Sequence, residues 1–325
     1  MSNESPLSTD YAALVEPRLS TTQTRWIAFS SACRPFGMVN LSPDTRVNGD
    51  WGCGYSFDDE QIVGFSHVHD WQIGALLMMP VVGEMDPRGG PEAFASPFSH
   101  DDEIVKPGYH RVHLQRYGID AELTATLRVG LHRYRFLASQ NAAILVDLAS
   151  TLGPSDMGEA ELRQLNPRCL EGSVVNLPTR RRPKPIRVFF AIALDHDATL
   201  ESFQGDEAHG VVIGIDGERI RARLRLGRPA RPVVLKVAIS YTSCQAAWEN
   251  LRAEAEGRDF DDIRQEARDE WNSWLSRIEV EGGTDEQRGR FYTDLFFALV
   301  GRRTCSDHTG SYIDNTGPTP VVRHI

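Results

Sequence analysis

The feature that most constrains the fold is a series of short β-type segments, each closed by turn residues, between about residue 26 and residue 242. In the clearest of them, GIDAELTATLRVG (118–130), polar residues alternate with six apolar ones, which are Ile119, Ala121, Leu123, Ala125, Leu127 and Val129. Because successive side chains of a strand point to opposite faces, this alternation predicts one strand with a buried face and a wet face. Similar segments follow without intervening helices, which predicts a mainly β, antiparallel sandwich rather than alternating strands and helices.

The pattern becomes helical at about Ser243. In the segment 259–278 the apolar residues recur at steps of three and four, which draws one apolar stripe along a helix formed by Phe260, Ile263, Ala267, Trp271, Trp274 and Ile278. A further helix is expected to open at Thr284, because Gln287 follows it in capping-box spacing. Its inward face is expected to carry Phe291, Leu295, Ala298 and Leu299.

These patterns predict four regions along the chain. They are a polar lead over residues 1–25, a β-sandwich domain over 26–242, a helical linker over 243–283, and the start of a helical domain over 284–325. Either the helices fold back on the sandwich, or the sequence stops inside a second domain.

Charge and cysteine content bear on partners and location. The chain has 45 acidic and 35 basic residues and a net charge of -10, which opposes binding to nucleic acids and to anionic membranes. Its five cysteines show no Cys-x-x-Cys spacing, which favours reduced thiols. The first 25 residues contain no apolar core of a signal peptide, and no run is long enough to span a bilayer. We therefore expect a cytoplasmic protein.

The segment GFSHVHDW (64–71) allows three interpretations. His67 and His69 share one face of a strand and could ligate a metal ion, although no spacing selects further ligands. Both could equally be core histidines that bond to the backbone. Trp71 favours a third interpretation, the wall of a ligand pocket, because an aromatic face beside hydrogen-bonding groups suits a sugar ring.

The remaining charged segments indicate no catalytic centre. The carboxylate runs 58–60, 101–103 and 261–262 are expected to be solvated, since neighbours in sequence do not face each other across a substrate as glycosidase carboxylates do. The basic run TRRRPKP (179–185) is interpreted as an exposed loop. No Gly-x-Ser-x-Gly elbow, P-loop or complete dinucleotide fingerprint is present in the sequence.

Several motifs, taken in order, resemble one known family. They are PFGMVNLSPDT, GYSFDDEQIVGFSHVH, MMP at 78–80, KPGYHRVHL, GIDAELTATLRVGLHRYRF and FYTDLFFALVGRRTCSDHTGSY. This series is similar to glycoside hydrolase family 92, the exo-acting α-mannosidases. The resemblance implies a β-supersandwich of the galactose-mutarotase type, joined by helices to an (α/α)6 toroid of which this sequence holds only the beginning.

The resemblance also implies a function and a set of site residues. Family members are calcium-dependent and inverting, with the catalytic acid, the base and the calcium ligands mainly in the toroid. We therefore expect no catalytic residue and no metal ligand in this chain, and no hydrolysis of mannosides by it alone. The expected partners are mannose-containing glycans and a missing or separate catalytic domain. Loops that reach the active-site mouth are expected to bind substrate through Arg34, Phe36, Gly37, Asp44, His67, His69 and Trp71.

Two departures from the family pattern matter for specificity and location. Where many members have FSHTHLSG, this chain has FSHVHDWQ, so Asp70 and Trp71 put the accepted linkage in question. Family members are commonly secreted or periplasmic, in contrast to the location expected from this sequence. Two other functions stay open, a stand-alone carbohydrate-binding sandwich and a metal-dependent β-barrel enzyme that uses His67 and His69.

Overall fold

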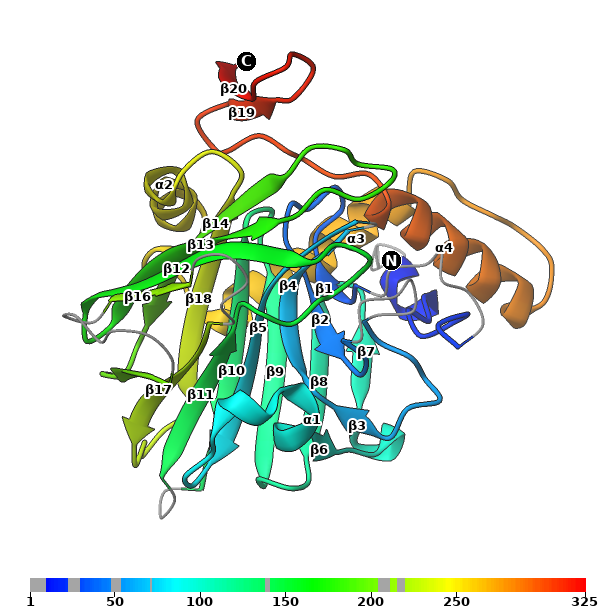
Figure 1. Cartoon of the computed structure of the whole chain (residues 1–325). Helices are drawn as coiled ribbons and strands as arrows, with labels where there is room; N and C mark the ends of the chain where they lie inside the picture. Colours follow the sequence, from blue (N-terminus) through cyan, green and yellow to red (C-terminus); the bar gives the residue numbers. More distant parts are fainter. Residues whose placement is uncertain are drawn as a thin grey trace.

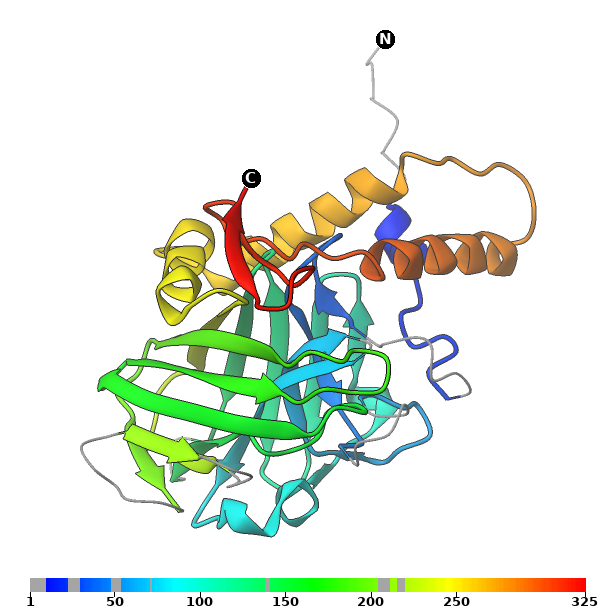
Figure 2. The same ribbon diagram turned by 45° about the horizontal axis from the view of Figure 1, so that its top comes forward.

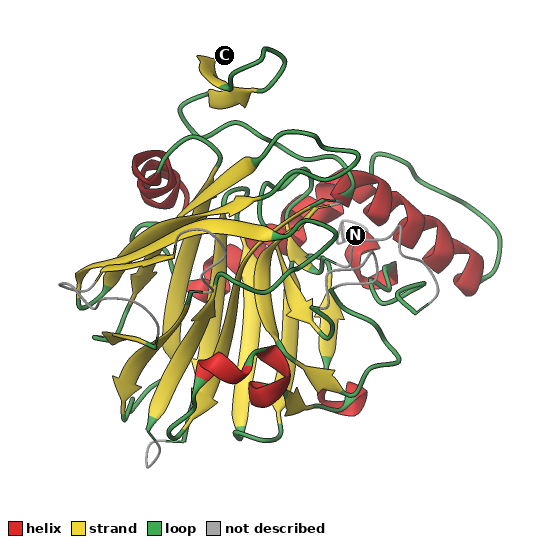
Figure 3. Cartoon of the chain, viewed as in Figure 1, coloured by secondary structure: helices red, strands yellow, loops and turns green. Residues whose placement is uncertain are grey.

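The computed structural model describes residues 10–22, 30–47, 54–70, 72–137, 141–203, 211–214 and 220–325. Two large antiparallel sheets form a sandwich, and helices lie around its outside (Figure 1; Figure 3). Residues from both sheets contribute to one large hydrophobic core. The predicted mainly β, antiparallel architecture is confirmed.

The two sheets differ in size. In spatial order, the seven-stranded sheet consists of β1 (Ala32–Cys33), β2 (Asn40–Asp44), β4 (Gly64–Asp70), β5 (Ile73–Val82), β11 (Ala142–Asp147), β17 (Arg221–Gly227) and β15 (Thr199–Ser202). The nine-stranded sheet consists of β16 (Val211–Gly214), β12 (Met157–Asn166), β13 (Cys169–Asn176), β14 (Ile186–Leu194), β18 (Val233–Ser240), β10 (Val129–Arg135), β9 (Ile119–Ala125), β8 (Tyr109–Leu114) and β7 (Ile104–Lys106).

Short elements border the sandwich. A small two-stranded sheet pairs β3 (Gln61–Ile62) with β6 (Ser96–Pro97), and a second pairs β19 (Ser311–Asp314) with β20 (Val321–His324). The short helices are η1 (Tyr11–Leu14), η2 (Pro87–Gly89), α1 (Pro91–Phe94) and η3 (His100–Asp102).

The segment 118–130 forms a hairpin, so the prediction of one continuous strand is wrong. β9 ends at Ala125 and β10 begins at Val129, and the amide of Thr126 donates to the carbonyl of Val129 over 2.9 Å. Glu254, from a helix far along the chain, accepts hydrogen bonds from the Thr126 hydroxyl and the Arg128 amide. The alternation of polar and apolar residues continues through this turn. Periodicity alone therefore does not reveal that β9 ends there.

A buried polar chain crosses between the two sheets. His67 on β4 donates from Nδ1 to the carbonyl of Leu76 (3.1 Å), so its Nε2 accepts a hydrogen bond from Nε2 of His132 on β10 (2.8 Å). The remaining nitrogen of His132 accepts from the hydroxyl of Tyr134 (2.6 Å). Burial lowers the pKa of His67 to about 4 and that of His132 well below its ordinary value, so both rings are neutral.

Two of the predicted helices fold back on the sandwich. α2 (Cys244–Ala255) packs on β18 and β14, and α3 (Phe260–Leu275) packs on β8 and β9. The predicted stripe on α3 is confirmed at Phe260, Ile263, Ala267 and Trp271, which are buried. Ile278 lies beyond the end of α3 and is exposed, because the helix ends before it.

The third helix, α4 (Asp285–Val300), begins with the predicted capping box between Thr284 and Gln287. Its inward face is carried by Tyr292 and Phe296, together with Thr293 and Val300. The predicted face is partly right: Phe291, Leu295 and Leu299 are half-buried and pack against the same cluster, whereas Ala298 is exposed. The reason is tertiary, because Phe296 packs on Trp271 of α3 and Tyr292 packs on Tyr11 of η1.

The predicted polar lead contains a structured element. η1 is capped by Asp10, and its Ala12 joins the buried cluster of α3 and α4 (Figure 2). The last described strand of the sandwich ends at Ser240, and α2 begins at Cys244. The proposed domain boundaries at 25, 242 and 283 stay predictions.

Two further observations bear on the chain's environment. Four cysteines, Cys33, Cys169, Cys244 and Cys305, are free thiols, whereas Cys53 lies outside the described residues. Among the described helices, none is both long and apolar enough to cross a membrane.

Candidate functional site

A tight turn positions the first three predicted site residues. The amide of Gly37 donates to the carbonyl of Arg34 over 3.0 Å, and a Cβ on Gly37 would lie only 3.0 Å from the carbonyl oxygen of Val39. Phe36 adopts a positive φ of 59°, which disfavours a bulky side chain. Its ring packs edge-on against Trp274 with the centroids 4.7 Å apart. Its carbonyl accepts from the amide of Thr304, so the turn joins α3 to the segment after α4.

Arg34 is buried and engaged by protein partners. Its Nε donates to the carbonyl of Ala125 over 2.7 Å, and Nη1 pairs with Glu270 of α3 over 2.5 Å. Nη2 lies 3.3 Å from both the carbonyl of Ile263 and the carboxylate of Glu266. The side chain is 3 % exposed, so in this structure Arg34 fastens α3 to the sandwich. Its predicted contact with substrate stays a prediction.

Asp44 and His69 form a buried pair where β2 meets β4. Nε2 of His69 lies 2.8 Å from Oδ1 of Asp44 and 3.0 Å from the hydroxyl of Ser66, and Nδ1 bonds to the carbonyl of Asn40 over 2.7 Å. The other carboxylate oxygen of Asp44 is buried, and no described residue donates a hydrogen bond to it. A buried acceptor of this kind calls for a donor from water or a ligand.

The two histidines of the segment 64–71 thus lie in different surroundings. His67 is fully buried in the chain that crosses between the sheets, whereas His69 lies near the end of β4 and keeps 7 % exposure. All four of their ring nitrogens bond to protein groups. Trp71, the aromatic residue expected beside them, lies outside the described residues.

Beyond His69, the end of β4 meets the segment after α4. Arg303 donates from Nη2 to the carbonyl of His69, and its Nη1 lies 3.8 Å from the carboxylate of Asp70. The side chain of Asp70 is 40 % exposed and that of Arg303 only 12 %. Partial burial raises the pKa of Tyr241, and the nearby charge of Asp70 raises it further. We name Asp70, Tyr241 and Arg303 the β4 rim, a half-open surface that presents one carboxylate.

The segment that carries Arg303 is held firmly in place. The buried carboxylate of Asp307 accepts from the Thr242 hydroxyl over 2.6 Å and from the side-chain amide of Asn250 over 2.8 Å. Arg128 donates to the carbonyl of Ser306 over 2.7 Å. The β4 rim is therefore built on a fixed support.

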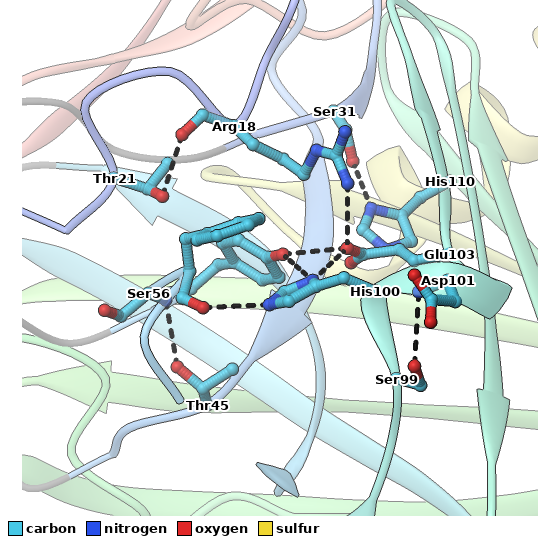
Figure 4. A network of polar contacts seen from close by, with 12 residues as sticks. Arg18, Thr21, Ser31, Thr45, Ser56, Ser99, His100, Asp101, Glu103 and His110 are labelled. Carbon is cyan, nitrogen blue, oxygen red and sulfur yellow. Dashed lines mark hydrogen bonds and ion pairs between the residues drawn. The ribbon is translucent and has the colours of Figure 1, made fainter. Parts of the chain in front are cut away.

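A second polar cluster surrounds Glu103, away from the β4 rim (Figure 4). One oxygen of this buried carboxylate bonds to His100 (2.8 Å) and Tyr55 (2.9 Å), and the other lies 3.0 Å from Nε2 of His110. Burial raises the pKa of Glu103, but the hydrogen bond and charge of His110 outweigh it, and the pKa falls to about 2. Because the Glu103 carboxylate is fully shielded from solvent, the cluster is a structural clamp.

The clamp also holds the N-terminal segment. Arg18 lies 3.7 Å from Glu103, and the hydroxyl of Ser31 lies 2.8 Å from Nδ1 of His110 (Figure 4). Glu103 therefore connects residues on both sides of β1 with the end of η3 and with β8.

Replacing Glu103 with glutamine is expected to lower the free energy of unfolding by about 2 kcal/mol at pH 7, since an uncharged amide mispairs with the buried partners. Urea unfolding measures the change, with Glu92→Gln on the exposed surface of α1 as the control. The folded pKa is lowered, so the stabilisation is present above pH 4.5 and is lost as the pH falls towards 2. Equal stability of both variants at pH 7 would contradict the structural role.

The described residues contain no cluster of the side chains that most often hold a metal ion. Among them, no group of three or more His, Cys, Asp or Glu side chains is placed to hold an ion. Calcium, which the family resemblance implies for the complete enzyme, stays a prediction.

Sequence reasoning missed Tyr241, Arg303 and Asp307. The only local signal for the last two is the polar run GRRTCSDHTGSY directly after an apolar helix, and this run says nothing about its neighbours. Tyr241 follows β18 and carries no signal of its own.

Solved structures share this fold. A family GH92 alpha-mannosidase from Bacteroides thetaiotaomicron matches with a TM-score of 0.86 and 24% identity, over 98% of this chain and 44% of that chain. A further structure of that mannosidase is a complex with mannoimidazole. A family GH92 inverting mannosidase from the same organism matches with a TM-score of 0.82 and 24% identity, over 98% of this chain and 44% of that chain. The chain shares its fold with less than half of each of these glycoside hydrolases.

Family models give the particular family. The glycosyl hydrolase family 92 N-terminal domain matches residues 14–240, and the family 92 catalytic domain matches residues 246–321. The chain therefore belongs to glycosyl hydrolase family 92. A curated relative from Arthroderma benhamiae, described as an uncharacterized secreted glycosidase, is 23% identical over 316 residues. That alignment covers 87% of this chain and 40% of the relative, so the chain spans less than half the relative's length.

Proposed function

We propose that this chain is the N-terminal part of an exo-acting, calcium-dependent, inverting α-mannosidase-type hydrolase and contributes sugar-binding loops to its active-site mouth. The observation that carries the proposal is the order of the two family matches, the N-terminal domain over residues 14–240 followed by the catalytic domain over residues 246–321. Solved relatives with this fold are more than twice as long.

The chemistry explains why the chain is proposed to be inactive alone. An inverting glycosidase needs one carboxylic acid to protonate the leaving oxygen and a second carboxylate to activate water on the opposite face. In the proposal, further catalytic-domain residues supply both groups and the calcium ligands. The part supplied here is the β4 rim, where Asp70 can accept hydrogen bonds from sugar hydroxyls while Arg303 holds it in place.

Support for a sugar contact comes from exposure and charge. Asp70 presents a half-exposed carboxylate, and charge-assisted hydrogen bonds to hydroxyls are stronger than neutral ones. In the pair with His69, one buried Asp44 oxygen has no partner among the described residues and needs a donor such as an ordered water. Mannose-containing glycans are thus the proposed ligands. The cytoplasmic location expected from the sequence stays a prediction.

Calorimetry with mannose and α-mannobiose tests the proposal. The chain is expected to bind with millimolar affinity, and Asp70→Asn is expected to weaken binding about fivefold, since one charge-assisted hydrogen bond is lost. Asp197→Asn, an exposed carboxylate paired with Arg168, is the matched control and should bind as the parent does. If sugar at about 20 mM produces no heat of binding, the proposed sugar-binding role is ruled out.

An activity assay tests the second part of the proposal, that the chain alone is inactive. With an aryl α-mannoside the chain alone is expected to show no release of phenol above the uncatalysed rate, with or without calcium. Release that persists in an Asp70→Asn variant would place a catalytic pair within this chain and overturn the proposed division of labour.

A stand-alone carbohydrate-binding module is the second candidate. The folding of α2 and α3 onto the sandwich favours it, because the sandwich and these helices share buried contacts within this one chain. Sugar binding by a monomer would be common to both candidates. Restored mannosidase activity on addition of a separately made family 92 catalytic region would decide for the enzyme part.

A further inference from the structure

A half-open, mostly apolar cavity of about 330 Å³ lies beside the β4 rim. Its walls come from β13, β14, the turn after β18 and the C-terminal hairpin β19–β20, whose place beside the sandwich is visible in Figure 1 and Figure 2. The lining includes Val175, Ile186, Phe189, Tyr241 and Ile313. Tyr241 belongs to both the cavity lining and the β4 rim, so the two are neighbours.

The size and lining of the cavity indicate a small ligand. Binding pockets for small molecules are typically concave, largely apolar and about 300–1,000 Å³ in volume. An apolar cavity of about 150 Å³ already binds benzene, so this one has room for a substituted ring. It is too small for a helix or a strand of a partner protein.

The charges in the wall are already compensated. Arg187, the charged residue of the lining, donates to Glu159 over 2.6 Å and to the hydroxyl of Ser173 over 2.9 Å. The hydroxyl of Thr242, also in the lining, donates to Asp307. An uncharged ligand therefore fits the cavity better than an anion or a cation.

One polar atom of the wall is unsatisfied. The side-chain amide oxygen of Asn315 is shielded from solvent and accepts no hydrogen bond from any residue that the structure describes, although the backbone carbonyl of the same residue accepts from Lys184. Leaving such an acceptor unpaired destabilises the structure, and a ligand hydroxyl that donates to it would recover that loss.

From these observations we infer that the cavity is a binding site for an uncharged, ring-sized apolar group that carries a hydrogen-bond donor, with phenol as the simplest example. The existence of this site does not depend on the proposed function. We assign as its natural occupant the non-sugar group of a glycoside whose sugar lies at the β4 rim, and this assignment rests on the proposed function.

Ligand-observed NMR titration of the full chain tests the site with phenol and toluene. Phenol is expected to bind with a Kd on the order of 1 mM, as its seven heavy atoms allow, and about fivefold more tightly than toluene. Val175→Phe fills the cavity and should weaken phenol binding at least tenfold, whereas Leu165→Phe, at an exposed position on β12, should not. No saturable phenol binding up to about 10 mM would overturn the inference.

A second variant tests the polar contact. Asn315→Leu keeps the size of the side chain and should abolish the preference for phenol over toluene while the variant still binds toluene. Thermal unfolding confirms that each variant is folded. A preference for phenol that survives Asn315→Leu would overturn the role of the amide oxygen.

Three ligands distinguish a failure of the cavity site from a failure of the proposed function. Phenyl α-mannoside is expected to bind at least tenfold more tightly than methyl α-mannoside in the parent chain and equally weakly in Val175→Phe. If phenol binds and methyl α-mannoside does not, the proposed sugar rim fails and the cavity site stands. If both bind but phenyl α-mannoside gains nothing, the assignment of the occupant is overturned.

Discussion

Arg34→Ala is expected to lower the free energy of unfolding by about 3 kcal/mol at pH 7. The substitution removes the donor to two main-chain carbonyls, those of Ala125 and Ile263, and the cation that pairs with Glu270. Unsatisfied buried carbonyls cost about 1–3 kcal/mol each. The carboxylates that face Arg34 are 32 % and 50 % exposed, so solvent compensates much of the lost ion pairs.

Urea unfolding of Arg34→Ala measures this effect. Arg252→Ala, at an exposed position on α2, is the matched control and should change stability by less than about 0.5 kcal/mol. The result also bears on the sequence-based expectation that Arg34 binds substrate. Parent-like stability combined with lost mannose binding would favour the substrate role over the fastening role seen here.

Acidification from pH 7 to pH 4 is expected to remove about 3 kcal/mol of stability through His67 alone. Burial holds the pKa of His67 at about 4 in the folded chain, below its ordinary 6.5. As the pH falls below 6.5, the unfolded chain therefore takes up the proton first, and the folded state loses stability until about pH 4. His132, whose pKa is also lowered by burial, acts in the same direction.

Unfolding titrations at several pH values test this expectation. The triple variant His67→Leu, His132→Leu, Tyr134→Phe replaces the whole polar chain with apolar groups. Its free energy of unfolding should decline much less between pH 6.5 and 4 than that of the parent chain. His113→Asn removes a histidine whose side chain is 37 % exposed, and its free energy of unfolding should change with pH as that of the parent chain does. An unchanged slope in the triple variant would show that other groups control acid stability.

The sequence predicted much of the architecture because it is encoded in local patterns. Alternation and turn residues indicate strands, and three- and four-residue spacing indicates α3. The capping box at Thr284 indicates where α4 begins. Local patterns failed where a distant residue decides the outcome, as at the turn between β9 and β10, which Glu254 holds in place.

The site was only partly predictable for the same reason. Sequence motifs brought Asp44 and His69 into one set, and the structure places them in contact. Arg303 and Tyr241, which complete the β4 rim, come from segments far along the chain and carry no signal that links them to Asp70. The predicted substrate contacts of Phe36, Gly37 and His67 stay predictions.

By itself, the sequence determined a β-sandwich followed by helices and a family of sugar hydrolases, because periodicity and ordered motifs are properties of neighbouring residues. Only the tertiary structure decided what the named side chains do. It fastens Arg34 to a residue 236 positions away and pairs His67 with a histidine 65 positions away. The physical reason is that burial and hydrogen bonding depend on which strands and helices pack together, and no local spacing records that packing.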